Sequence, residues 1–407
     1  MALANILDAE SRRRSALLPI FLIVMVDVLG LTIILPLLPF YAERMGASPM
    51  VVGLLVSTYA ACQLVAGPLL GQISDRMGRR PLLLVSQVGT FAGFLILAYA
   101  QSLWIVFLAR IIDGLTAGNL SLAQAYISDV TRPEDRAKSF GVIGVAFGIG
   151  FLIGPAMSAF LSQYGYRYPI FTAAGLSATS ILSTYFLLPA APVAPKETEA
   201  EGPPPPAGRR LRVLDWGNYS TYFKRPALAV LLWQFFAFAF AFAIFMSGFA
   251  LFAERRYTWN GHPFGVKEVG YVYAYVGFLG IILQGGLIGR LVKWLGELRL
   301  VRIGFLSATV GFAMIGFSYN VPELVVAAAL SSFGTGVLRP ALTSLITQRA
   351  SREEQGVVLG LTQSLMSVAQ IVAPAIAGFL IDHSLLTTWA LVGASVCGLG
   401  LLIERWQ

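Results

Sequence analysis

Two acidic residues lie inside long apolar stretches of the chain, Asp27 in DVLGLTIILPLLPFY and Asp113 in LARIIDGLTAG. Asp27 falls about eleven residues into its stretch, or ~16 Å along a helix, which is close to the middle of a bilayer. A charge at that depth costs roughly 2.5–3.5 kcal/mol, so such groups face protein or water and mark functional sites. Either carboxylate can carry a proton, and a substrate can compete with that proton. The alternative for Asp27 is a polar contact that fixes helix packing.

Two arginines lie in stretches of the same kind, Arg110 and Arg339. Arg110 and Asp113 are three residues apart, so on a helix they can form a static salt bridge. The other interpretation is a switchable pair, in which protonation of Asp113 frees Arg110 for another partner or an anionic substrate. Arg339 either faces a central cavity or extends toward the membrane surface. Gln234 and Gln284 are candidates for lining the same cavity, because an amide in lipid lacks a partner.

These residues must be positioned by membrane helices. Of the 407 residues, 57% are hydrophobic and only 12% are charged, whereas soluble domains carry about 25% charged residues. The mean hydropathy of +0.73 is distributed over repeated, nearly uncharged blocks of about 20 residues, each long enough to cross a bilayer. We predict an all-α membrane protein with twelve spans near residues 16–42, 50–72, 82–100, 103–128, 139–163, 168–189, 227–252, 268–288, 300–319, 322–346, 356–380 and 386–403.

The net charge of +8 has a one-sided distribution. Most of the 29 Lys and Arg residues fall in segments on one side of the predicted spans, which is typical of the cytoplasmic side and places both termini there. The bilayer, and not a nucleic acid, is therefore the expected partner of the basic segments. The sequence contains no phosphate-binding loop, no spacing typical of a metal site and no pattern typical of an enzyme, so we expect no cofactor.

The chain divides into two similar halves. Residues 190–224, with KETEAEGPPPPAGRR, cannot build a core and form a predicted cytoplasmic linker between a half at 1–189 and a half at 225–407. Gly141 and Pro155 in the first half align with Gly360 and Pro374 in the second without a gap. Because each half has an even number of spans, the two repeats are parallel. In membrane proteins built this way, a substrate site is expected between the halves, near the middle of the bilayer.

The segment GQISDRMGRRP, at residues 71–81, lies between the second and third predicted spans. Its glycines permit a tight turn, and its basic residues hold the loop on the cytoplasmic side. In this order of residues the sequence resembles the signature loop of the major facilitator superfamily. The matching positions are Gly71, Asp75, Arg76, Gly78, Arg79 and Arg80. This resemblance implies that Asp75, Arg79 and Asp129 form a cytoplasmic gate that locks one conformation.

Further motifs extend the resemblance over most of the chain. LARIIDGLTAG resembles the family's fourth-helix motif, with Arg110 as its buried arginine, and GIGFLIGPAMSA resembles its fifth-helix antiporter motif. The fifth-helix positions that match are Gly150, Gly154 and Pro155. The region after Asp27 is similar to drug/proton antiporters, particularly tetracycline exporters. Asp113 and Arg339 depart from that group's pattern, and Ser158 and Ala159 replace its usual glycine pair.

The resemblance implies a secondary active transporter, in which protons drive efflux of small amphipathic or drug-like compounds by alternating access. Two alternatives share the fold: a lipid or lysolipid translocase, in which Arg110 and Arg339 engage a phosphate head group, and a transporter of organic anions or metabolites. The expected location is a bacterial inner membrane, and a monomer suffices because each chain supplies both halves.

Overall fold

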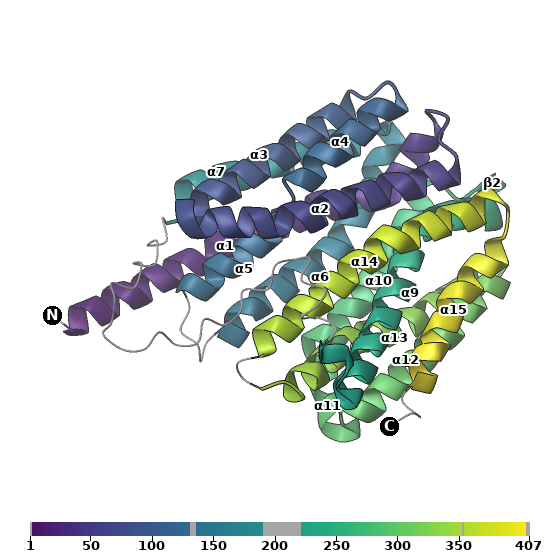
Figure 1. The fold of residues 1–407 in the computed structure, drawn as a ribbon. Coiled ribbons are helices and arrows are strands. Elements are labelled where there is room, and N and C mark those ends of the chain that lie inside the picture. The colour runs from purple at the N-terminus through teal and green to yellow at the C-terminus, as the bar shows by residue number, and fades with distance from the viewer. Residues whose placement is uncertain (1, 131–135, 190–220, 352–353, 404–407) are drawn as a thin grey trace. The chain divides into compact units, whose positions relative to one another are not determined.

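The computed structural model describes residues 2–130, 136–189, 221–351 and 354–403. Within these ranges, twelve helical spans are long and apolar enough to cross a membrane (Figure 1). The helices are α1 (Ala2–Glu43), α2 (Pro49–Met77), α3 (Arg79–Ala98), α4 (Leu103–Leu115), α5 (Asn119–Val130), α6 (Arg136–Leu161), α7 (Arg167–Leu187), α9 (Pro226–Arg256), α10 (Val266–Ile282), α11 (Ile288–Leu295), α12 (Glu297–Phe317), α13 (Val321–Gln348), α14 (Gln355–Asp382) and α15 (Leu386–Ile403).

The predicted all-α fold with twelve spans is confirmed, and most span boundaries agree within a few residues. Three spans consist of more than one helical piece, and one of them is the fifth, which contains α6 and a 3₁₀ turn η2 (Ser162–Tyr164). The fourth contains α4 and α5, and the eighth contains α10, a π-helical turn η3 (Leu283–Leu287) and α11. A short antiparallel hairpin of β1 (Thr258–Trp259) and β2 (His262–Pro263) precedes α10. Most of the predicted linker, 190–220, lies outside the described residues.

Glycines with positive φ separate two pairs of consecutive helices. Gly78, between α2 and α3, has φ 94° and ψ 152°, and Gly296, between α11 and α12, has φ 75° and ψ 159°. Residues with a Cβ rarely adopt this conformation, so each glycine permits the tight turn that the sequence predicted at Gly78. The two glycines lie 218 positions apart, close to the 219 that separate Gly141 from Gly360, so their shared conformation agrees with the internal repeat.

Contacts divide the chain into two compact units. The first unit comprises Met1–Leu38 and Ala61–Gly202, and the second comprises Pro39–Ala60 and Pro203–Gln407. The predicted division at 189 and 225 follows the internal repeat instead of contacts, and it stays a prediction. Each unit is described by itself below.

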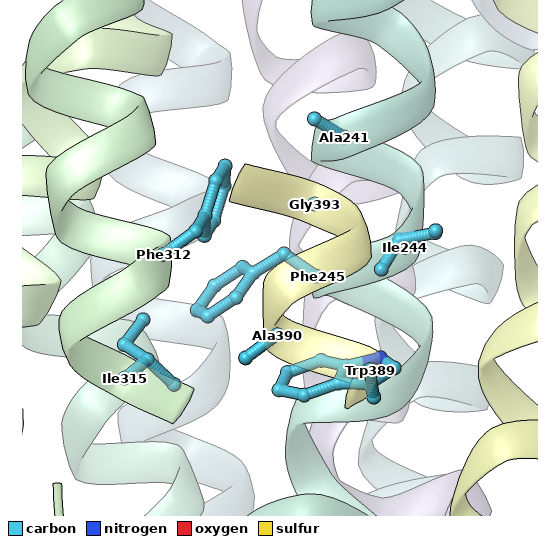
Figure 2. A pocket seen from close by; sticks show the side chains of 8 residues that line it. All are labelled: Ala241, Ile244, Phe245, Phe312, Ile315, Trp389, Ala390 and Gly393. Carbon is cyan, nitrogen blue, oxygen red and sulfur yellow. The ribbon is translucent and has the colours of Figure 1, made fainter. Parts of the chain in front are cut away.

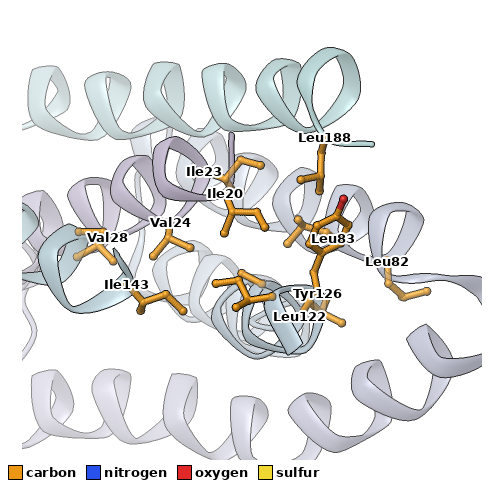
Figure 3. Packing of buried hydrophobic residues seen from close by; sticks show 13 residues of the cluster. Ile20, Ile23, Val24, Val28, Leu82, Leu83, Leu122, Tyr126, Ile143 and Leu188 are labelled. Atoms are coloured by element: carbon orange, nitrogen blue, oxygen red, sulfur yellow. The ribbon is translucent and has the colours of Figure 1, made fainter. Parts of the chain in front are cut away.

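In the first unit, a hydrophobic core joins α1, α3, α5 and α6 (Figure 3). Tyr126 is buried at its edge, and its hydroxyl donates to the Pro189 carbonyl (2.8 Å), so the one polar atom of this large side chain is satisfied. The buried members of the core are Ile20, Ile23, Val24, Val28, Leu82, Leu83, Leu122, Ala123, Tyr126, Ile127, Ile143, Ala146 and Leu188.

In the second unit, aromatic rings fill the space between α9, α12 and α15. The Trp389 ring stacks on Phe252, with centroids 4.6 Å apart, and Phe245 lies 5.6 Å from Phe312. A small apolar pocket remains among these helices (Figure 2). Its lining residues are Ala241, Ile244, Phe245, Phe312, Ile315, Trp389, Ala390 and Gly393.

Candidate functional site

The fourth span is interrupted where a continuous helix over 103–128 was expected. α4 ends at Leu115, residues 116–118 form a turn, and α5 begins at Asn119. Ser86 of α3 stabilises this break, because its hydroxyl donates to the Thr116 carbonyl and accepts from the Gly118 N–H (3.0 Å). Backbone groups that a helix would normally pair are thus satisfied by a neighbouring side chain, as non-helical backbone at membrane depth requires.

Arg110 and Asp113 form an ion pair on α4, one turn before the break. Arg110 Nη1 lies 3.3 Å from Asp113 Oδ2, and the two side chains are only 5% and 7% exposed. The predicted pairing on one helix is therefore present. Whether the pair is static or switchable is a question of mechanism, and the switchable interpretation stays a prediction.

Asp27 of α1 lies beside this pair. Its carboxylate is close enough to Asp113 for the two charges to interact, and Asn119 and Ser180 supply polar groups beside it. Asp27 Oδ1 is buried and has no hydrogen-bond partner among the described residues. The structure thus brings Asp27, Arg110 and Asp113, three of the predicted site residues, into one cluster of the first unit.

Gln87 of α3 completes the surroundings of Asp27. It is fully buried, and its Nε2 donates to the Ser180 hydroxyl (2.8 Å), which ties α3 to α7 beside the carboxylate. Sequence reasoning missed Gln87, Asn119 and Ser180. Their signal was available, because uncharged polar side chains inside apolar spans are costly unless they meet one another.

The predicted gate residues of the first unit also come together. Arg79 Nη2 lies 2.6 Å from Asp75 Oδ1, and Arg79 Nε lies 2.8 Å from Asp129 Oδ2. Ser74 accepts a further hydrogen bond from Arg79 Nη1 (2.5 Å). One guanidinium therefore joins the end of α2, the start of α3 and the end of α5.

The other residues of the signature loop have separate positions. Arg80 donates to the Tyr185 carbonyl of α7, and its guanidinium lies 5.8 Å from the centre of the Tyr185 ring. Arg76 is exposed in the last turn of α2, and Gly71 lies within α2, where a Cβ would meet no described atom within 4 Å.

The fifth-helix motif packs α6 closely against α1. The Thr32 hydroxyl donates to the Gly150 carbonyl (2.8 Å), and a Cβ on Gly154 would stand 1.9 Å from Thr32 Oγ1. Pro155 follows inside α6. The small residues of the motif therefore allow α6 to pack closely against α1, while the role of the motif in transport stays a prediction.

The predicted residues of the second unit are spread over several helices. Gln234 is 2% exposed, and its Nε2 donates to the Gly400 carbonyl (3.0 Å). It therefore joins α9 to α15 and does not have the cavity-lining position that the sequence suggested, because the amide finds its partner inside the helix bundle. Gln284 and Arg339 are exposed, Gln284 in η3 and Arg339 in α13.

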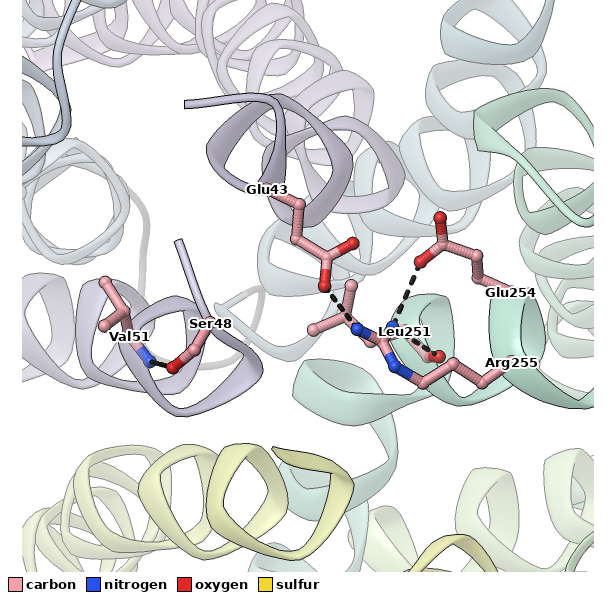
Figure 4. A network of polar contacts seen from close by, with 6 residues as sticks. All are labelled: Glu43, Ser48, Val51, Leu251, Glu254 and Arg255. Atoms are coloured by element: carbon pink, nitrogen blue, oxygen red, sulfur yellow. Dashed lines mark hydrogen bonds and ion pairs between the residues drawn. The ribbon is translucent and has the colours of Figure 1, made fainter. Parts of the chain in front are cut away.

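A charged network in the second unit was not predicted (Figure 4). Arg255 Nη2 lies 2.6 Å from Glu43 Oε1, and Arg255 Nη1 lies 3.0 Å from Glu254 Oε2. Arg255 was expected in a loop, but α9 continues through it and ends at Arg256. This ion pair could not be predicted from the sequence, because Glu43 and Arg255 are 212 positions apart.

Comparisons with known proteins agree with this arrangement. The sequence profile of the Major Facilitator Superfamily matches residues 20–318 and 286–406. The class D tetracycline resistance protein of Salmonella ordonez is 30% identical over 388 residues, which cover 94% of each chain. Multidrug resistance protein 2 of Bacillus subtilis (strain 168) is 26% identical over 390 residues, covering 93% of this chain and 92% of the relative.

A solved structure has the same fold. The crystal structure of the human organic anion transporter MFSD10 (TETRAN) superposes with a TM-score of 0.70 at 24% sequence identity. The match covers 96% of this chain and 99% of that chain, so the likeness extends over all twelve spans.

Proposed function

Because the chain belongs to the major facilitator superfamily, a family of transporters and not of enzymes, we propose that it exports small amphipathic compounds in exchange for protons. The observation that carries this proposal is the cluster of Asp27, Arg110 and Asp113 inside the first unit. Charges buried in a membrane-spanning bundle are costly, and they are retained where they bind ions or substrates.

Asp27 is the group that takes up the proton. Its Oδ1 has no partner in the described part of the chain, whereas Asp113 is paired with Arg110. A proton on Asp27 removes a buried charge and also the repulsion between the two carboxylates. This change alters the electrostatic balance around Arg110 and Asp113, directly before the break at residues 116–118. A local change of charge favours one of two conformations of a protein only where it acts on an element that can change its arrangement, and the break at residues 116–118 is the element proposed here.

Transporters built from two parallel repeats alternate their access by rocking one repeat against the other around a substrate site. In this proposal, the ion network of Asp75, Arg79 and Asp129 forms in one conformation and breaks in the other. The side that carries most basic residues is cytoplasmic, both termini lie there, and the membrane is a bacterial inner membrane. One chain suffices for transport.

The substrate class follows from the relatives and from the second unit. Two relatives are a tetracycline resistance protein and a multidrug resistance protein, which supports export of drug-like compounds. The exposed Gln284 and Arg339 lie on segments that touch, since a Cβ on Gly336 of α13 would meet the Leu283 side chain of η3 at 2.7 Å. They supply an amide and a cation as polar contacts for a bound compound.

A second candidate is transport of an anion, such as a lysolipid head group or an organic acid. The observation that favours it is Arg339, an exposed guanidinium within the tenth span, because guanidinium groups bind phosphate and carboxylate in two-pronged geometry.

The test uses purified protein in liposomes that contain a pH dye, with an imposed proton gradient. Cationic and neutral drugs, organic anions and lysolipids are added in turn. Drug-induced proton flux that is lost in Asp27→Asn, and retained in the control Asp382→Asn at the exposed end of α14, supports the proposal. Movement of lysolipid or anion without proton flux for any drug would instead support the second candidate.

A further inference from the structure

Three side-chain oxygens in the cluster around Asp27 accept no hydrogen bond from any described residue. They are Asp27 Oδ1 on α1, Gln87 Oε1 on α3 and Asn119 Oδ1 at the start of α5. The Ser180 hydroxyl of α7 joins two of these residues, because it accepts from Gln87 Nε2 (2.8 Å) and lies beside the Asp27 carboxylate, and the Asn119 side chain lies beside the same carboxylate. Buried acceptors are rarely left without a donor, so several in one place point to a ligand that oxygen atoms bind.

The charge of the cluster identifies the sign of that ligand. The charged group that interacts with Asp27 is Asp113 of α4, which is itself paired with Arg110. Around these two carboxylates, α3, α5 and α7 contribute the uncharged Gln87, Thr90, Asn119 and Ser180. With both carboxylates ionised and Arg110 cationic, the cluster has one net negative charge. A single positive charge neutralises it, whereas a divalent ion would leave an excess in an environment where charge is costly.

The break in the fourth span favours the same ligand. Its carbonyl end, at Leu115, lies two residues after Asp113, and Asn119 begins the next helical piece. The C-terminal end of a helix carries partial negative charge. Interrupted membrane helices use such ends, together with unwound backbone, to bind Na⁺ or protons in transporters.

We propose that Asp27, Gln87 and Asn119 bind one Na⁺ ion through Oδ1, Oε1 and Oδ1, and that Na⁺ competes with protonation of Asp27. A proton alone does not satisfy this group, since a protonated carboxyl has one O–H and can donate to one of the neighbouring amide oxygens. An alkali cation accepts several oxygen ligands at once, and carboxylate and amide oxygens are the ligands that such hard cations prefer. This proposal shares only Asp27 with the proposed function.

The test measures equilibrium binding of radioactive ²²Na⁺ to the purified full chain in lipid nanodiscs, without organic substrate. We expect saturable binding of about one ion per chain that weakens as the pH falls. Asp27→Asn should abolish binding, and Gln87→Leu or Asn119→Leu should weaken it about tenfold or more, as loss of an orienting or ligating group does at other ion sites. Ser158→Ala, which removes a buried and equally unpartnered hydroxyl of the described part of α6, should bind as the parent does.

Folding is checked in the same samples by thermal unfolding in Na⁺ and in choline. Na⁺ should raise the unfolding midpoint of the parent, of Ser158→Ala and of Gln87→Glu, which keeps an acceptor oxygen, but not that of Asp27→Asn. No saturable Na⁺ binding by the parent, or equal binding by the parent and both leucine variants, would overturn the site. If Na⁺ binding fails while drug-induced proton flux persists, the ion site is wrong and the exporter stands. If Na⁺ binds but no drug induces proton flux, the exporter is refuted and the ion site stands.

Discussion

Arg225 and Glu354 form a two-pronged ion pair that joins the starts of two helices in the second unit. Arg225 Nη2 lies 2.7 Å from Glu354 Oε1, and Nη1 lies 3.0 Å from Oε2. Arg225 directly precedes α9 and Glu354 directly precedes α14. The Arg225 hydrogen bonds, aided by the backbone N–H and hydroxyl of Ser351, lower the pKa of Glu354 from 4.5 to about 2.

This pair should lose its stabilising effect in acid. Because the pKa of Glu354 is lower in the folded chain than its ordinary 4.5, the pair stabilises the fold fully above that value and progressively less as the pH falls toward 2. Both partners are partly exposed, so the effect is at most about 1 kcal/mol. Thermal unfolding from about pH 6 to about pH 3 checks it: the difference between the parent and Arg225→Gln should shrink. A difference that persists, or one that Lys224→Gln shares, would contradict the prediction.

Asp75→Asn should slow the transport cycle several-fold without weakening equilibrium binding of substrate. The substitution removes one of the two carboxylates that hold Arg79, and so destabilises the conformation in which the network is formed. Transport rates in liposomes and substrate binding to purified protein separate the two effects. A defect confined to affinity would refute the gate, and Asp382→Asn serves as the control at an exposed carboxylate.

Gly154→Ala should destabilise the protein by about 1–3 kcal/mol, because overpacking forces neighbouring elements apart. The new Cβ would stand 1.9 Å from Thr32 Oγ1 and 2.8 Å from Thr32 Cβ, so rotation of the hydroxyl alone cannot relieve the contact. Unfolding in denaturant measures the change. Gly175→Ala is the matched control, since a Cβ there meets no described atom within 4 Å. Equal stability of the two variants would show that α1 and α6 are not held together at this point.

Ser86→Ala should cost about 1 kcal/mol, because it removes two hydrogen bonds to the break in the fourth span, while the Gly118 N–H and the Thr116 carbonyl keep the bond that they make to each other (2.7 Å). The affected groups are Gly118 N and Thr116 O. Ser367→Ala is the control, since its hydroxyl donates to Gln363 O within its own helix (3.1 Å). If both variants unfold at the same denaturant concentration, Ser86 does not stabilise the break.

The spans and several local contacts could be predicted from the sequence. A span can be recognised from its apolar run, because backbone groups in lipid must pair within a helix and a helix needs about 20 apolar residues to cross the bilayer. The turn at Gly78 followed from the glycines of the motif at residues 71–81, and the grouping of Asp75, Arg79 and Asp129 was implied by the resemblance to the major facilitator superfamily.

The surroundings of Asp27 could not be predicted in the same way. Gln87, Asn119 and Ser180 come from three different helices, and only the packing of those helices brings them to one carboxylate. The break at residues 116–118 was missed because three residues hardly change the hydropathy of a span, and its stability depends on Ser86 in another helix. The position of Gln234 was predicted wrongly for a related reason, since its acceptor, Gly400, is 166 residues away.

The interrupted fourth span also has a consequence for how the chain is made. α4 has 13 residues and α5 has 12, so at 1.5 Å per residue each measures only about 20 Å or less, against a hydrocarbon thickness of about 30 Å. Neither piece can enter the bilayer as an independent hairpin arm during synthesis. Ser86 precedes Thr116 and Gly118 in the chain, so it is synthesised before the break with which it pairs. We therefore expect the fourth span to insert more readily after the third span than without it.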